Sequence, residues 1–301
     1  MLMRQLTKVN QAASEETENK LEEKRKRGRP KGSKNKNRRD IVLSPVNQLL
    51  QNYLSEVLEV IGDSVKITYC LLDGAFGNNQ AIQMVRRTGL HIVSKLNRRS
   101  ALYLPFAGEQ KKRGARRKYG EKIDYKALPV EKLCSSQVED GIETLIYQFC
   151  SWHKKIADQL NVVVIVKTDQ ATGKQGHVVL FSTDLALGWE KLIDLYVLRF
   201  QIEFNFREAK QFWGLEDFMN IKPLQIFNAA NLAMFMVNIA HVLWQLLPVT
   251  QGSTQDLKTV FRGRIYATHL LKFLPEPLDP LLMDLFLQEI CSLGAIHPTK
   301  T

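Results

Sequence analysis

Residues 196–210 read YVLRFQIEFNFREAK, and this stretch carries the strongest pattern in the 301-residue chain. Its polar members Tyr196, Arg199, Glu203 and Lys210 occupy relative positions 0, +3, +7 and +14. On a helix that turns about 100° per residue, these four side chains share an arc of about 60°. Phenylalanines and aliphatic residues fill most of the other directions. The pattern predicts one long helix over 189–213, ended by Gly214, with a single polar stripe.

This polar stripe combines a carboxylate with two cations and a phenol, a set that suits a metal ion held against a phosphate backbone. Glu203 would ligate the ion, and Arg199 and Lys210 would contact phosphates. Tyr196 would donate a hydrogen bond. The alternative is an amphipathic helix whose polar face meets water and is tied by an Arg199–Glu203 pair.

A second candidate acid, Asp73, follows the apolar segment VKITYCLL over 65–72, which predicts a buried strand. An acid at the carboxyl end of such a strand lies where open α/β sheets bind their ligands. The alternative is that Asp73-Gly74 is an ordinary turn dipeptide. Asn78 or Asn79 is expected to cap a helix that runs to Gly89, followed by a strand over 90–96.

The spacing Y-(2)-R-(3)-E-(6)-K and the segment LLDGAFGNN around Asp73 resemble those of DDE transposases of the insertion-sequence-4 type, over about 25–220. The resemblance implies a ribonuclease H-like core in which Asp73 and Glu203 are catalytic and bind Mg²⁺ or Mn²⁺. It implies DNA transposition, with strand cleavage and transfer by two-metal phosphoryl transfer. Double-stranded DNA, as transposon ends and target, is the implied partner, and a homodimer is a further implication because such proteins generally act on paired ends.

The first catalytic aspartate of that family has no clear counterpart, because only Asp40 and Asp63 precede Asp73. Asp40 ends a basic segment, and Asp63 follows Gly62 in a helix-to-strand turn. We therefore expect an N-terminally truncated and inactive copy with a partial core. Two alternatives are a non-catalytic DNA-binding remnant and an unrelated basic nucleic-acid-binding protein whose motif match is coincidental.

The net charge of +11 is concentrated in two blocks, which indicates a polyanionic partner. Residues 1–40 contain thirteen Lys/Arg and six acids, and residues 86–122 contain twelve and two. Within the first block, Arg27-Gly28-Arg29-Pro30 matches the core of an AT-hook, which lies in a narrow minor groove. The alternative there is a solvated basic loop. The second block includes a loop over 111–118 whose DNA-binding candidates are Lys111, Lys112, Arg113, Arg116 and Arg117.

The order of expected elements predicts an α/β fold with an antiparallel β insertion and C-terminal helices. Ser44-Pro45 should open a helix that ends at Gly62, and strands are expected over 144–152, 161–168 and 176–182, the last two joined by a hairpin with Gly173 in the turn. Further helices are expected over 223–247 and 270–291. The predicted divisions are a flexible basic arm over 1–40, a first core part over 41–100, a β-rich insertion over 101–186, the signature helix over 187–221 and a helical region over 222–301.

The four cysteines are far apart and form no C-x-x-C pair, which favours free thiols over zinc or disulfides. The apolar run over 224–247 is interrupted by asparagine, histidine and glutamine residues that fall mostly on one side of a helix. It predicts a packed amphipathic helix, with no membrane partner. No hydrophobic signal-peptide segment is found at the N-terminus, and we expect a cytoplasmic protein.

Overall fold

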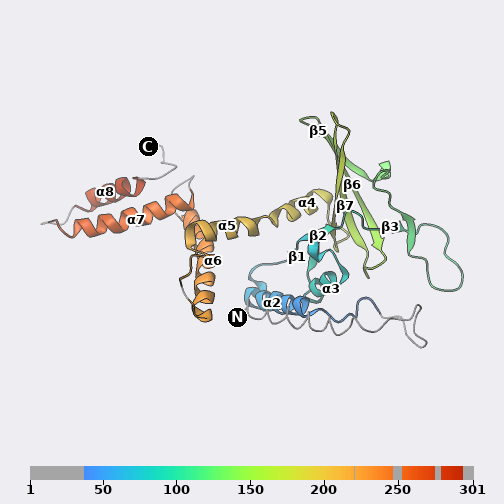
Figure 1. The fold of residues 1–301 in the computed structure, drawn as a ribbon, viewed down its shortest axis with the longest axis horizontal. Coiled ribbons are helices and arrows are strands. Elements are labelled where there is room, and N and C mark those ends of the chain that lie inside the picture. Colours follow the sequence, from blue (N-terminus) through green and yellow to red (C-terminus); the bar gives the residue numbers. More distant parts are fainter. Residues whose placement is uncertain (1–36, 220, 247–252, 275–278, 294–301) are drawn as a thin grey trace. The chain divides into compact units, whose positions relative to one another are not determined.

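The computed structural model describes residues 37–219, 221–246, 253–274 and 279–293. The chain divides into two compact units, one up to Arg199 and the other from Phe200 onward (Figure 1). The predicted AT-hook and most of the predicted basic arm lie outside the described residues.

The first unit is built on an eight-stranded sheet with the order β1-β2-β8-β7-β6-β3-β4, and β5 also pairs with β6. Only the β1/β2 pair is parallel; all other pairs are antiparallel. With its helices, this sheet gives the predicted mixed α/β fold and is consistent with a partial ribonuclease H-like core. The strands are β1 (Tyr69–Leu71), β2 (His91–Leu96), β3 (Leu102–Pro105), β4 (Tyr119–Lys122), β5 (Leu133–Glu139), β6 (Ile142–His153), β7 (Leu160–Asp169) and β8 (Gln175–Ser182).

The antiparallel part of the sheet confirms the three strands predicted from β-branched and aromatic runs. β7 is the most buried of them, and its valines pack on both faces of the sheet. The β7–β8 connection is the predicted hairpin. Gly173 adopts a φ of 65° there, and the carboxylate of Asp169 accepts the backbone N–H groups of Ala171 and Thr172. Strands β3, β4 and β5 were not predicted, because their short sequences alternate weakly or are mostly exposed.

The strand predicted over 65–72 is much shorter than expected. Only Tyr69–Leu71 pairs with β2, and the side chains of Val65 and Ile67 are 61% and 37% exposed. The prediction of a fully buried strand was wrong for its first half. β1 lies at one end of the strand order, so it has one described neighbour along which to extend.

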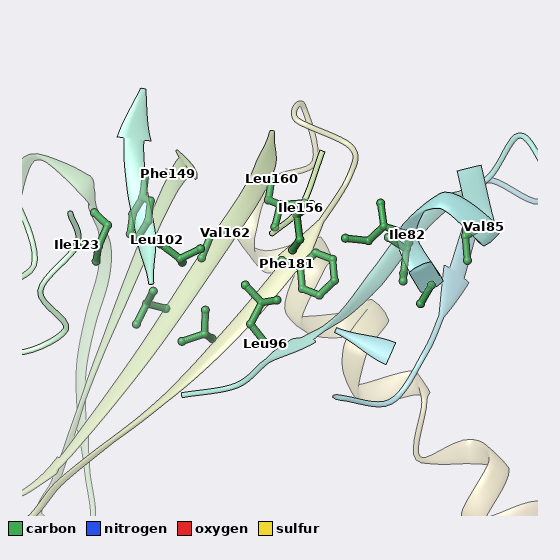
Figure 2. Packing of buried hydrophobic residues seen from close by; sticks show 14 of the residues in the cluster. Ile82, Val85, Leu96, Leu102, Ile123, Phe149, Ile156, Leu160, Val162 and Phe181 are labelled. Carbon is green, nitrogen blue, oxygen red and sulfur yellow. The ribbon is translucent and has the colours of Figure 1, made fainter. Parts of the chain in front are cut away.

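Helices α2 (Pro45–Ile61) and α3 (Asn79–Arg87) begin where their capping residues predicted. Ser44 accepts the N–H of Asn47, and Asn78 accepts the N–H of Ala81. Gly62 ends α2 with a φ of 53°. Ile82 and Val85 of α3 pack toward the sheet residues Leu96 and Phe181, within a core that continues to Leu102 and Phe149 (Figure 2).

The predicted single helix over 189–213 is two helices, α4 (Trp189–Leu198) and α5 (Gln201–Trp213), as Figure 1 shows. The amide of Arg199 bonds the carbonyl of Tyr196, and the amide of Glu203 bonds that of Phe200. These bonds reach back three residues instead of four, so they tighten the chain and interrupt the α-helical ladder. Gly214, with a φ of 72°, ends α5 as predicted.

The second unit contains α5, α6 (Pro223–Leu246), α7 (Thr254–Leu271) and α8 (Pro280–Ser292). α5 packs against α6, and α7 against α8. α7 was not predicted, although Ser253 and Asp256 form a capping box at its start. Of the helix expected over 270–291, Leu270 and Leu271 belong to the end of α7, and the part from Pro280 is α8.

α6 was predicted to be a packed helix, but few of its apolar side chains are buried, and the others are half-buried or exposed. Its buried residues are Ala233, Val237 and Ala240, whereas Leu224 and Leu246 are 69% and 74% exposed. Within the described part of the chain, α6 alone is long and apolar enough to cross a membrane, judged by length and composition only. This is weak evidence for a span, because core helices of soluble proteins meet the same criterion.

Candidate metal and DNA site

Asp73 lies at the carboxyl end of β1, as the sequence predicted. It is exposed and caps a short 3₁₀ helix over Gly74–Phe76, with one carboxylate oxygen accepting the N–H of Gly74 at 2.5 Å. Because β1 and β2 are parallel, the carboxyl ends of both strands lie at the same edge of the sheet. Asp73 is therefore held at the edge where open α/β sheets present their ligand-binding groups.

Strand β2 fixes the loop that carries Asp73. The hydroxyl of Ser94, which is fully buried, donates a 2.8 Å hydrogen bond to the Asp73 carbonyl. Gly77 approaches β2 so closely that a Cβ there would lie 2.3 Å from the Lys95 carbonyl oxygen. Gly77 is thus required because a side chain would collide with the backbone of β2. Its φ of −72° is one that any residue can adopt, so conformational freedom is not the reason.

The chemistry of Asp73 fits a hard divalent cation. Its carboxylate forms no ion pair with any described residue, and its only described hydrogen bond occupies one of the two oxygens. Exposed carboxylate oxygens are the ligands that Mg²⁺ and Mn²⁺ prefer. Over residues 37–293, apart from the undescribed gaps, no three His, Cys, Asp or Glu side chains cluster as a ready metal site.

The signature residues are divided between the two units. Tyr196 and Arg199 belong to the first unit, where the Arg199 guanidinium lies 5.6 Å from the Tyr196 ring centroid. Glu203, in the first turn of α5, and Lys210 belong to the second. Lys210 pairs with Glu216 at 2.7 Å, and both side chains are largely exposed. The predicted approach of Asp73 and Glu203 stays a prediction.

The two earlier acids lie outside the strands, as the sequence suggested. Asp40 is exposed in a bend, where it accepts a hydrogen bond from the Asn37 amide at 2.7 Å. Asp63 is exposed in a 3₁₀ turn over Gly62–Ser64. Neither has the strand-end position that Asp73 has.

The basic loop over 111–118 is exposed and joins β3 to β4. Its neck is closed by Gln110, whose side chain exchanges hydrogen bonds of 2.8 and 2.9 Å with the backbone of Arg117. Arg117 lies over the ring of Phe106 at 4.5 Å, and Lys118 lies over Trp152 at 5.2 Å. The candidate residues Lys111, Lys112, Arg113 and Arg116 extend from this anchored neck into solvent.

The end of the basic arm is attached to the first unit through Asp158. Arg39 and Arg86 each bind the same Asp158 oxygen at 2.6 Å, and Gln83 donates to the other at 2.7 Å. Burial raises the pKa of Asp158, but the Gln83 hydrogen bond and the two guanidinium groups outweigh it and lower the pKa overall. Arg39, near the end of the predicted arm, is thus held beside α3. Arg27 and Arg29 lie outside the described residues.

The described cysteines are free thiols, but only one of them is buried, whereas buried thiols were expected. Cys70 is buried, Cys150 is half-buried and Cys134 is exposed. Burial raises the pKa of the Cys70 thiol to about 11, so this group is protonated and unreactive at neutral pH.

Sequence reasoning did not single out Lys95, Arg98 and Arg99, which follow the buried part of β2. They were counted only within the basic block over 86–122. Their position could have identified them, because they lie at or just after the carboxyl end of β2, the strand that runs parallel to β1.

Comparison with known families agrees with this geometry. A family model described as DDE superfamily endonuclease matches residues 4–159, just over half of the chain. The chain therefore belongs to the DDE superfamily endonuclease family. The matched region contains Asp73, whereas Glu203 and the rest of the signature lie beyond it. No curated protein matches the chain.

Proposed function

We propose that this protein is a DNA transposase of the insertion-sequence-4 type, acting on double-stranded DNA at transposon ends. The observation that carries the proposal is Asp73, an exposed acid fixed at a strand end in a chain of the DDE superfamily endonuclease family. The complete Y-(2)-R-(3)-E-(6)-K spacing supports the finer assignment. Membership of the family replaces the alternative of an unrelated basic protein.

In this proposal Asp73 and Glu203 hold divalent ions, Mg²⁺ or Mn²⁺. When bound, such ions activate a water or hydroxyl oxygen and stabilise the leaving oxygen of an in-line displacement at phosphorus. Asp73 contributes a carboxylate oxygen from a loop whose backbone is held by β2. Arg199 and Lys210 contact the DNA phosphates. Tyr196, stacked on Arg199, restricts that guanidinium and donates a hydrogen bond.

In this proposal DNA binds to the cations of two segments, the loop over 111–118 and the basic arm. The loop over 111–118 projects from the neck closed by Gln110, and Arg39 near the end of the predicted arm is held by Asp158. The cations of both segments would contact the phosphates of a duplex. A homodimer on paired DNA ends and a cytoplasmic location belong to the same proposal.

A second candidate is a non-catalytic DNA-binding protein of the same family. It is favoured by the positions of Asp40 and Asp63, neither of which accompanies Asp73 at the sheet edge. In this case the cations would hold transposon ends without cleaving them. The expected missing first acid and the resulting inactivity remain predictions from the motif order.

A cleavage assay separates the two candidates. The chain is incubated with supercoiled DNA carrying the transposon ends and Mg²⁺ or Mn²⁺, beside Asp73→Asn and Glu203→Gln. The matched control is Asp140→Asn, an exposed carboxylate in the β5–β6 turn. Metal-dependent nicking that both site variants abolish and the control retains supports the transposase. DNA binding without nicking in any protein supports the second candidate.

A further inference from the structure

The carboxyl end of β2 opens into a hollow of about 560 Å³. Its lining runs from Lys95 to Arg99 on one side and from His177 to Val179 of β8 on the other. The walls are the buried Leu96 and Val179, and the rim carries the exposed side chains of Lys95, Arg98 and Arg99.

The turn after β2 is rigidly built, so the rim groups have a fixed origin. Ring nitrogen Nε2 of His177 donates to the Arg98 carbonyl at 2.8 Å, and the His177 ring stacks on Tyr125 with centroids 4.6 Å apart. The hydroxyl of Tyr125 donates to the Ser100 carbonyl at 2.7 Å. The side-chain oxygen of Asn97 accepts the Arg99 N–H at 2.9 Å. The strand β8 and the segment after β4 therefore clamp this turn from outside.

The rim is strongly and one-sidedly charged. Within the described part of the chain, none of Lys95, Arg98 and Arg99 forms an ion pair. Three uncompensated cations around one hollow create a positive potential that selects anions. Guanidinium groups match the geometry of phosphate oxygens, which they bind in pairs of hydrogen bonds.

The hollow adjoins the loop that carries Asp73. A Cβ on Gly74 would lie 3.0 Å from Cε of Lys95, so the Lys95 side chain lies against this loop while it also lines the hollow. The parallel pairing of β1 and β2 puts the acid and the cations at the same sheet edge. A carboxylate for metal and a cationic hollow therefore lie beside each other.

We propose that Lys95, Arg98 and Arg99 form a binding site for a backbone phosphate of DNA. This phosphate would neighbour the one at which a metal ion held by Asp73 acts. The assignment of the phosphate to DNA rests on the proposed function, but the anion site itself does not. The shared chemistry is a phosphate oxyanion, which a DNA backbone or a free phosphate can supply. Binding here would hold the strand in register with Asp73 without contacting bases, as backbone contacts do.

The test compares Arg98→Gln/Arg99→Gln with Lys167→Gln/Lys174→Gln, a control that removes the same charge from two exposed residues at the β7–β8 hairpin. Two probes are used in EDTA, so that metal and cleavage play no part: inorganic phosphate, followed by thermal shift, and a transposon-end duplex, followed by titration at several salt concentrations. Lys95→Gln is a single-site check, and circular dichroism verifies folding.

We expect phosphate to raise the melting temperature of the wild type and of the hairpin control, but not of Arg98→Gln/Arg99→Gln. In the duplex titrations, the slope of log affinity against log salt concentration should fall by about one unit for each phosphate contact that a variant removes. Equal phosphate stabilisation of all the proteins would overturn the site. Loss of phosphate binding with unchanged duplex affinity would overturn its assignment to DNA. A failed cleavage assay with these binding results would overturn the proposed function and leave the anion site standing.

Discussion

The hydroxyl of Ser94, in the middle of β2, donates a 2.8 Å hydrogen bond to the backbone carbonyl of Asp73. This bond joins the end of β1 to its only parallel neighbour. Because Ser94 is fully buried, the bond is shielded from water and holds the acid's backbone at the sheet edge. The position of the candidate metal ligand is therefore set by a strand other than its own.

Gly77→Ala should destabilise the first unit and displace the Asp73 loop. The new Cβ would lie 2.3 Å from the Lys95 carbonyl, a contact that only backbone movement can relieve. Overpacking of this kind costs about 1–3 kcal/mol, measured as a lower denaturant midpoint. Gly188→Ala is the matched control, since a Cβ there meets nothing within 4 Å. Equal stability of the two variants would contradict the close approach.

Asp158→Asn should change how stability depends on pH. The folded state lowers the pKa of Asp158, so this carboxylate stabilises the fold above its unfolded pKa of about 4 and loses that contribution as pH falls through the folded value. Hydrogen bonds to such charged groups contribute about 1.5–3 kcal/mol. The variant should be less stable at pH 7 and should lose less stability between pH 5 and 3. Parallel acid-denaturation curves for the two proteins would refute this role.

Deleting residues 24–36 should weaken duplex binding and reduce its salt dependence. This segment contains eight Lys/Arg, and phosphate contacts release counterions whose number sets the salt slope. The deletion stops before Arg39, so the Asp158 anchor is kept. If Arg27-Gly28-Arg29-Pro30 acts as an AT-hook, A·T-rich duplexes lose more affinity than G·C-rich ones. Binding that is flat across salt concentrations would contradict the electrostatic account.

Arg199→Ala and Lys210→Ala should each weaken binding to transposon-end DNA, whereas Glu203→Gln should not. The two cations are assigned to phosphate, and Glu203 is assigned to metal and repels DNA. Arg207→Ala is the control on α5, because Arg207 lies over the Phe204 ring outside the signature spacing. An affinity loss for Glu203→Gln as large as that for Arg199→Ala would overturn this separation of roles.

Local sequence signals predicted those parts of the fold that short-range physics determines. Caps at Ser44 and Asn78, the turn at Gly173 and the stop at Gly214 occur where the residue types placed them. The same reasoning placed Asp73 at a strand end. The caps, the turn and the helix stop each depend on neighbours within a few residues.

The errors arose where distant partners decide the structure, or where local hydrogen bonds depart from a regular helix. Val65 and Ile67 are β-branched, yet they stay outside the sheet because the pairing of this segment with β2 begins only at Tyr69. The helical periodicity over 189–213 could not reveal the three-residue hydrogen bonds at Arg199 and Glu203 that divide it. The cationic hollow after β2 could not be predicted from the sequence either, because it forms only when β8 pairs with β2.

The proposed function requires that Asp73 and Glu203 bind a common divalent metal ion. Crystals of the chain bound to transposon-end DNA and soaked in Mn²⁺ would test it most directly, through anomalous diffraction that locates the metal. The account predicts Mn²⁺ bound by both carboxylates, with the two groups within about 8 Å of each other. Carboxylates more than about 15 Å apart, with no ion shared between them, would contradict it.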